Sequence, residues 1–139
     1  MDNSGESQSD LPEHLQRGQD GEALAAAYLR RKGWKIEDTN FETEWGEIDI
    51  IATRPFPTGG QMMAFVEVKS RSSPGKMTPE LSVTASKRRT ITRMARYYEQ
   101  RYGRPNTGYR FDVIAVDFSE SPPNIRHFEA AFDASGNPY

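Results

Sequence analysis

Polar and apolar residues alternate along several short segments of the chain, and a period of two residues is typical of a β-strand with one buried face. The segment at 110–118 (RFDVIAVDF) alternates strongly, and the isoleucine-rich segment at 47–53 is preceded by turn-forming residues. The pattern predicts four strands and a short fifth strand, at 34–41, 47–53, 62–70, 110–118 and 125–128.

Two other segments have the spacing of three to four residues that an amphipathic helix requires. Residues 14–32 carry apolar side chains along one side, and Gly33 follows as a stop signal. The second helix is predicted to begin at Thr78 or at Thr84 and to run to about Tyr102. Its apolar stripe consists of Ile91, Met94, Ala95, Tyr98 and Tyr102.

The order of these elements is helix, three strands, helix and one or two strands, which predicts an α/β fold with a mixed central sheet flanked by helices. The loop at 54–61 contains two prolines and two glycines, and it joins the strands on either side as an antiparallel hairpin. The second helix is long enough to act as a crossover, so the strands before and after it can lie parallel.

The length of the chain bounds its organisation. At 139 residues it most simply forms one domain, which we assign to 14–132, with a disordered acidic tail at 1–13 and a C-terminal tail at 133–139. No apolar run reaches the roughly 20 residues of a membrane-spanning helix, and the N-terminus is neither a signal peptide nor a transit peptide. The chain has no cysteine, which excludes disulfides and a thiol nucleophile. We therefore expect a cytoplasmic protein that does not bind membranes.

Charged residues interrupt two of the predicted strands. In GEIDIIA (46–52) Glu47 and Asp49 share one face of the strand, and in FVEVKSR (65–71) Glu67 and Lys69 share one face. If the two strands are neighbours, Asp49, Glu67 and Lys69 come within side-chain reach of one another. Two acids and one ammonium group at a single place can hold a divalent metal ion beside a phosphate.

This set of groups suits the hydrolysis of a phosphodiester bond. Asp49 and Glu67 would be ligands of Mg²⁺ or Mn²⁺, and the backbone carbonyl of Val68 would be a third ligand. Lys69 would orient the attacking water or stabilise the charge of the transition state.

Two further carboxylates are candidates for the same site. Glu47 competes with Asp49 for the role of principal ligand because both lie on one face of their strand. Glu22 lies on the first helix at the border of its packed side, and would bind the metal directly or support its ligands. The alternative is that Glu67 and Lys69 face solvent on a half-exposed strand, where such a pair contributes about 0–1 kcal/mol.

Basic residues are concentrated after the second of these motifs. Residues 69–110 contain eleven Lys and Arg residues and two acids, a local charge of +9 on a chain whose net charge is −2. A charge run of this kind is often a solvated face, but its position directly after FVEVK favours contact with a phosphate backbone. The candidate nucleic-acid-binding residues are Arg71, Lys76, Lys87, Arg88 and Arg93.

Other conspicuous residues have a structural and a functional interpretation. Trp34, Trp45 and Tyr109 could stack on unpaired bases, but large aromatic residues near strand ends more often belong to the core, which is the interpretation we favour. Asp112 and Asp117 alternate with apolar residues in one strand, and we expect both to be exposed.

The acidic motifs resemble those of the PD-(D/E)xK nuclease superfamily, in which a helical glutamate precedes an aspartate and a Glu-x-Lys motif. More closely, GQDGEALAAAYL, NFETEWGEIDIIA, FVEVKSR and YRFDVIAVD resemble a bacterial family of uncharacterised proteins typified by YraN, over roughly residues 14–132. The resemblance implies a restriction-endonuclease-like fold similar to that of archaeal Holliday-junction resolvases. Ile48 stands where the superfamily's name has proline. The catalytic candidates that the resemblance supports are Glu22, Asp49, Glu67 and Lys69.

Three functions are compatible with these observations. The leading hypothesis is a Mg²⁺-dependent or Mn²⁺-dependent endonuclease whose substrate is nucleic acid, DNA rather than RNA, with a structured or branched form. The second is a nucleic-acid-binding module that keeps the fold and the basic face without effective catalysis. The third is a protein-interaction domain whose basic helix binds an acidic partner. Symmetric cleavage of two strands would favour a homodimer.

Overall fold

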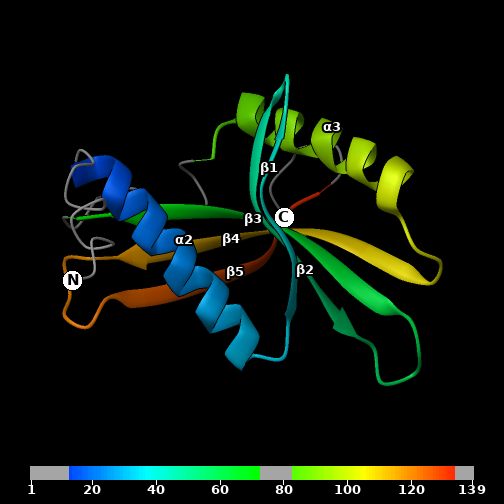
Figure 1. The fold of residues 1–139 in the computed structure, drawn as a ribbon, viewed down its shortest axis with the longest axis horizontal. Coiled ribbons are helices and arrows are strands. Elements are labelled where there is room, and N and C mark those ends of the chain that lie inside the picture. Colours follow the sequence, from blue (N-terminus) through cyan, green and yellow to red (C-terminus); the bar gives the residue numbers. More distant parts are fainter. Residues whose placement is uncertain (1–12, 73–82, 134–139) are drawn as a thin grey trace, which may run out of the picture.

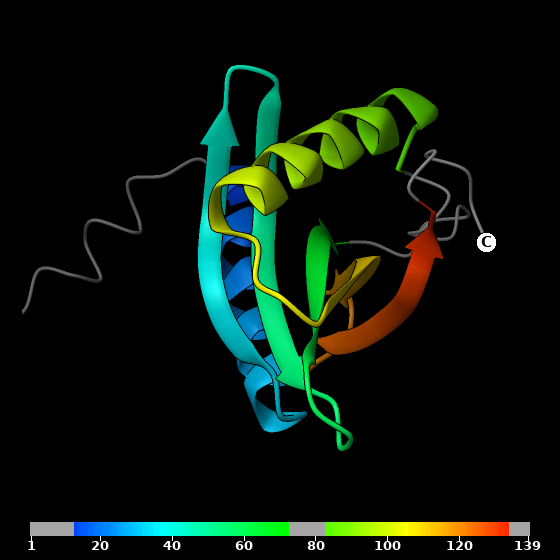
Figure 2. The same ribbon diagram turned by 90° about the vertical axis from the view of Figure 1, so that its right-hand side faces the viewer.

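A computed structural model describes residues 13–72 and 83–133 of the chain. Its elements follow the predicted order, with helix α2 (Glu13–Arg31) before three strands and helix α3 (Ala85–Tyr102) before the last two. The helices cover opposite faces of a single sheet (Figures 1 and 2), which confirms the predicted α/β fold. Lys76 and most of the two predicted tails lie outside the described residues.

The five strands form one mixed sheet. Their order in space is β1-β2-β3-β4-β5, with β3 and β4 parallel and the other neighbours antiparallel. The parallel pair confirms that α3 is the crossover between them. The last strand is longer than predicted because it pairs with β4 along most of its length. The bounds are β1 Lys35–Thr43, β2 Gly46–Pro55, β3 Gln61–Arg71, β4 Thr107–Asp117 and β5 Asn124–Phe132.

Helix α3 packs on one face of the sheet through its apolar stripe. Thr84 caps its N-terminus, since the hydroxyl of Thr84 accepts a hydrogen bond from the Lys87 amide at 3.1 Å. Ile91, Met94 and Tyr98 are buried against alternate side chains of β3, as the predicted stripe requires. Tyr102 departs from this prediction, because its side chain is 49% exposed at the C-terminal end of the helix.

Helix α2 packs on the opposite face, where the other side chains of β3 point. Ala25 and Leu29 are buried with the apolar residues of that face. Gly21 allows a close approach, because a Cβ atom at this position would lie 1.9 Å from Ser70 Oγ of β3. Among the described residues, no helix is long and apolar enough to cross a membrane.

The expected exposure of Asp112 is wrong, because this residue is fully buried. Its Oδ2 atom lies 2.7 Å from His127 Nε2 and accepts a hydrogen bond from Arg110 at 3.0 Å, and its Oδ1 atom accepts one from the Ala130 amide at 2.9 Å. These partners compensate the buried charge, so a polar position in an alternating strand is tolerated inside. Asp117 is half-buried and pairs with Arg71 at 3.7 Å.

The predicted core aromatics fall into two groups. Trp34 is buried at 3% exposure, which confirms its place in the core. Tyr109 is half-buried and stacks on Phe65, with the ring centroids 6.1 Å apart. Trp45 is also half-buried, at the turn between β1 and β2, where it packs against Tyr97 of α3 with the ring centroids 5.7 Å apart.

Strands β2 and β3 separate part of the way along their length. Their ladder runs from Pro55 opposite Gln61 to Ile50 opposite Val66, and no further pair joins them among the described residues. Beyond this point residues 46–49 continue with β1 and residues 67–71 continue with β4, so that the hairpin of β1 and β2 rises away from the sheet (Figure 1). We call the place where β2 and β3 separate the fork. The charged residues of both motifs lie there.

Candidate active site

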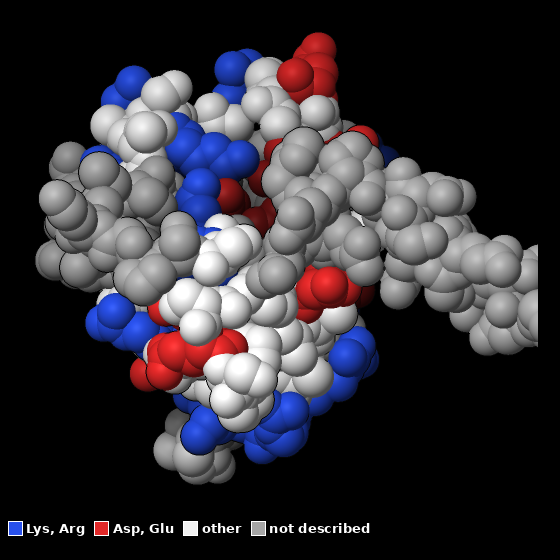
Figure 3. Space-filling model, turned by 90° about the vertical axis from the view of Figure 1, so that its left-hand side faces the viewer, with Lys and Arg blue, Asp and Glu red and all other residues white. Residues whose placement is uncertain are grey.

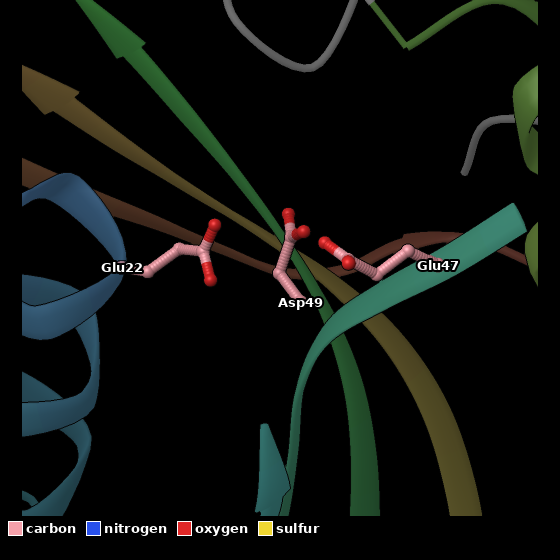
Figure 4. Close-up of side chains that lie close together, drawn as sticks. All are labelled: Glu22, Glu47 and Asp49. Carbon is pink, nitrogen blue, oxygen red and sulfur yellow. The ribbon is translucent and has the colours of Figure 1, made fainter. Parts of the chain in front are cut away.

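Three carboxylates from two elements meet at the fork. Glu22 comes from α2, and Glu47 and Asp49 come from β2; one oxygen atom of each lies within 4.8 Å of the others. Figure 4 shows Asp49 between the other two side chains, with all three carboxylates directed toward one region. The fold therefore brings Glu22 beside Asp49, as the sequence predicts, and places Glu47 there as well.

A hydrogen bond holds the Asp49 side chain in place where β2 and β3 separate. Its Oδ2 atom accepts a hydrogen bond from the backbone amide of Val68 at 2.8 Å. This amide lies beyond the last ladder pair between β2 and β3, so the Asp49 side chain replaces the missing main-chain acceptor. The bond holds Asp49 against β3, next to Glu67.

Glu67 is the most buried of the four acids, at 6% exposure. Its Oε1 atom lies 3.7 Å from Lys69 Nζ and 3.8 Å from Lys87 Nζ. Its Oε2 atom is buried and has no hydrogen-bond partner among the described residues. A buried carboxylate oxygen without a partner is costly and rare in proteins, and a bound cation would supply one.

Three of the four predicted catalytic residues, Glu22, Asp49 and Glu67, line one cleft. The fourth, Lys69, contacts Glu67. The cleft has a volume of about 370 Å³, and Figure 3 shows acidic atoms recessed beside Lys and Arg side chains on this side of the molecule. The lining residues include Glu22, Asp49, Glu67, Val68, Ser70 and Arg71.

Burial, together with the charges of neighbouring acids, raises the pKa values of three acids at the site. Burial, followed by the charges of Asp49 and Glu47, raises the pKa of Glu22 to about 7. Burial, followed by the charge of Glu67, raises the pKa of Asp49 to about 7, although the hydrogen bond from Val68 acts in the opposite direction. The pKa of Glu67 is also raised, mainly by burial. These groups carry an unfavourable concentration of negative charge that a bound cation would relieve.

This set of atoms fits a divalent cation with oxygen ligands. Mg²⁺ binds through one or two carboxylates together with water and substrate phosphates. The site offers three converging carboxylates and the buried Oε2 atom of Glu67. Cysteine is absent from the chain, so the donors are those that suit Mg²⁺ or Mn²⁺ rather than a thiolate metal. The individual ligand roles, including that of the Val68 carbonyl, stay predictions.

The predicted nucleic-acid-binding residues have different surroundings. Lys87 faces the site through Glu67, and Arg71 lines the cleft while it pairs with Asp117. Arg88 donates to the backbone carbonyl of Val83, so it also stabilises the start of α3. The guanidinium of Arg93 lies 4.2 Å from the centre of the Trp45 ring, at the turn between β1 and β2.

One residue of the site has no counterpart among the sequence predictions. Asn40 of β1 lies opposite Asp49, because Thr39 pairs with Ile50 and Phe41 pairs with Ile48 on either side of it. A two-residue turn at 44–45 fixes this register. The predicted strands at 34–41 and 47–53 leave five residues between them, so their spacing does not reveal this register.

Comparison with known proteins identifies relatives over most of the chain. Residues 21–116 match the model of the uncharacterised protein family UPF0102. A UPF0102 protein of Anaeromyxobacter dehalogenans is 40% identical over 121 residues, 87% of each chain. One from Syntrophotalea carbinolica is 42% identical over 126 residues, which cover 89% of this chain and 97% of the relative. One from Alkaliphilus oremlandii is 43% identical over 114 residues, 81% of this chain and 93% of the relative.

The matched region contains all three acids that line the cleft, Glu22, Asp49 and Glu67. The match also includes α3 and nearly all of β4. Because these similarities extend over most of the chain, it belongs to the UPF0102 family.

Proposed function

We propose that the protein is a metal-dependent endonuclease that hydrolyses phosphodiester bonds in DNA. The observation that carries the proposal is the buried Oε2 atom of Glu67, in a cleft that Asp49 and Glu22 also line. Within residues 13–72 and 83–133 this atom has no hydrogen-bond partner. Two lysines, Lys69 and Lys87, approach the other oxygen of the same carboxylate. Acids that can hold a cation and ammonium groups that can attract a phosphate thus lie in one place.

Different residues of the site would contribute to different parts of the hydrolysis. A bound Mg²⁺ or Mn²⁺ would neutralise the phosphate charge and make a water molecule more nucleophilic. Asp49, Glu67 and Glu22 or Glu47 would hold that ion, and the Asp49 carboxylate is already oriented by the Val68 amide. Lys69 would place a positive charge beside the attacked phosphate and orient the water.

The basic residues of α3 would hold the polyanion against the cleft. The first turn of the helix contains no acid, and Lys87 at its start contacts Glu67 of the site. Neutralising phosphates with Lys and Arg releases counterions, so binding would be sensitive to salt and largely independent of sequence. The basic residues of the helix are Lys87, Arg88, Arg89, Arg93, Arg96 and Arg101.

Branched or structured DNA is the substrate form that we propose, following the resemblance to Holliday-junction resolvases. Symmetric cleavage of two strands at a junction would require two sites, and a homodimer would supply them.

The test is incubation of the protein with branched, duplex and single-stranded DNA in the presence of Mg²⁺ or Mn²⁺. We expect cleavage of at least one branched substrate by the wild type. Asp49→Ala and Glu67→Ala should abolish cleavage and retain binding, because they remove acids that repel phosphate. Binding of all three forms by the wild type without cleavage of any would contradict the proposal, as would equal cleavage by the variants.

A further inference from the structure

Asn40 has an unusual backbone conformation for a residue inside a strand. Its φ angle is 53°, in the left-handed region that side chains other than asparagine and aspartate seldom occupy. Glycine would adopt this conformation with less strain. Asparagine also tolerates this conformation, so the role of the Asn40 side chain is judged from its contacts.

The Asn40 side chain lies against two of the three clustered carboxylates, Glu22 and Glu47. Its amide nitrogen faces them, since the opposite orientation would place the amide oxygen against two acceptors. In this orientation the nitrogen donates to Glu22 Oε1 at 2.7 Å and to Glu47 Oε1 at 3.2 Å. The two hydrogens of one amide group therefore join α2 to β2.

The position of Asn40 explains why one residue can reach both acids. It lies opposite Asp49 in the ladder of β1 and β2, at the fork where Glu22 approaches from α2. Three carboxylates within 4.8 Å of one another repel, and without a donor between them Glu22 and Glu47 would turn apart into solvent. A neutral amide supplies donors there without a positive charge that would compete with a cation.

We propose that Asn40 is a positioning residue, which holds Glu22 and Glu47 together so that they meet a divalent cation as one preformed set. This inference rests on the function proposed above and adds a residue outside the expected ligand set. Groups that orient metal ligands typically contribute 10–100-fold to metal affinity. The contribution of Asn40 should be of this size, and it should come from the amide rather than from the backbone.

Asn40→Gly separates these two contributions, because glycine keeps the left-handed backbone and removes the amide. The matched control is Asn106→Gly, the same substitution at another exposed asparagine, whose φ is 55° in the turn before β4. The measurement is the dissociation constant of Mn²⁺ alone, by calorimetry or electron paramagnetic resonance, for both variants, the wild type and Asp49→Asn. The thermal unfolding midpoint without metal is recorded for each.

We expect Asn40→Gly to weaken Mn²⁺ binding about 10–100-fold while Asn106→Gly leaves it unchanged, with neither midpoint falling substantially. If the variant also cleaves DNA slowly, excess Mn²⁺ should restore its rate. Wild-type affinity in Asn40→Gly, with Asp49→Asn impaired, would overturn the role of Asn40 and leave the cleft intact. Unchanged affinity in Asp49→Asn would overturn the site itself, and the proposed function with it.

Discussion

The carboxylate of Asp49 accepts a hydrogen bond from the Val68 amide at 2.8 Å, at the point where β2 and β3 part. The same carboxylate lies beside Glu22 and Glu47. One side chain thus completes the hydrogen bonding of a strand and contributes to a cluster of acids. Its structural and its proposed catalytic contribution can be separated, because asparagine keeps an acceptor for the amide and removes the charge.

Asp49→Asn should make the metal-free protein more stable at mildly alkaline pH. The Asp49 pKa of about 7 means that its ionised form is unfavourable in the folded state. Removing that charge should raise the free energy of unfolding by about 1–3 kcal/mol, measured by urea unfolding in EDTA. Glu120→Gln, at an exposed position, is the control and should change little. A less stable Asp49→Asn protein would mean that its charge is already compensated within the fold.

Glu22 and Asp49 should contribute less to the stability of the metal-free protein as pH rises. The folded pKa values of Glu22 and Asp49 lie near 7, above their ordinary values of 4.5 and 3.8. At pH values between the ordinary and the folded pKa values, these groups therefore hold more protons in the folded state than in the unfolded state. The contribution of these two groups to stability is therefore greatest below their unfolded pKa values and is lost as pH rises through about 7. Urea midpoints across this range give the slope, and saturating Mg²⁺ should reduce or reverse it because cation binding displaces the protons. A slope of the same size with Mg²⁺ would contradict cation binding by these acids.

Gly21→Ala should disturb the approach of α2 to β3. The new Cβ atom would lie 1.9 Å from Ser70 Oγ and 3.1 Å from Ser70 Cβ, so the helix or the serine must shift. We expect a loss of about 1–3 kcal/mol in the free energy of unfolding, with partial recovery when Ser70→Ala is added. Gly18→Ala is the matched control on the same helix, since its Cβ would meet nothing within 4 Å. Equal effects at Gly18 and Gly21 would show that helix propensity, rather than this contact, decides the result.

The order of the elements was predictable because each helix and strand has a strong period and lies between turn residues. The alternation that placed Glu67 and Lys69 on one face holds in the structure, where their side chains lie 3.7 Å apart. The convergence of Asp49 with Glu67 followed from the hairpin that joins their strands. Local pattern was sufficient for these features because neighbours in the sheet are also neighbours in sequence.

The remaining features depend on contacts that a local pattern does not contain. To predict the fork between β2 and β3, one must know where their pairing ends. The position of the fork allows Glu47 and Asn40 to reach the site. Asp112 is buried because His127, fifteen residues away, meets it across the pairing of β4 with β5. Tyr102 continues the spacing of its stripe but is exposed at the end of its helix.

Arg93→Ala should weaken binding of DNA by a similar factor for every sequence. Arg93 lies on α3 over the ring of Trp45. If Arg93 contacts a phosphate, loss of this contact should reduce the slope of log affinity against log salt concentration by about one. Fluorescence anisotropy at several salt concentrations gives both values. Arg126→Ala is the control, because Arg126 lies on β5 at the opposite edge of the sheet. An unchanged slope would remove Arg93 from the proposed interface.

The acidic cleft is proposed to hydrolyse DNA with the help of a divalent cation, and the cleavage rate of a branched DNA under single-turnover conditions measures this activity. The rate is measured for the wild type, Glu67→Gln and Glu120→Gln, first in EDTA and then with Mg²⁺. We expect no cleavage in EDTA, equal rates for the wild type and Glu120→Gln with Mg²⁺, and a rate lower by about a hundredfold or more in Glu67→Gln. Cleavage by Glu67→Gln at the wild-type rate, or no cleavage by the wild type with Mg²⁺, would contradict the claim.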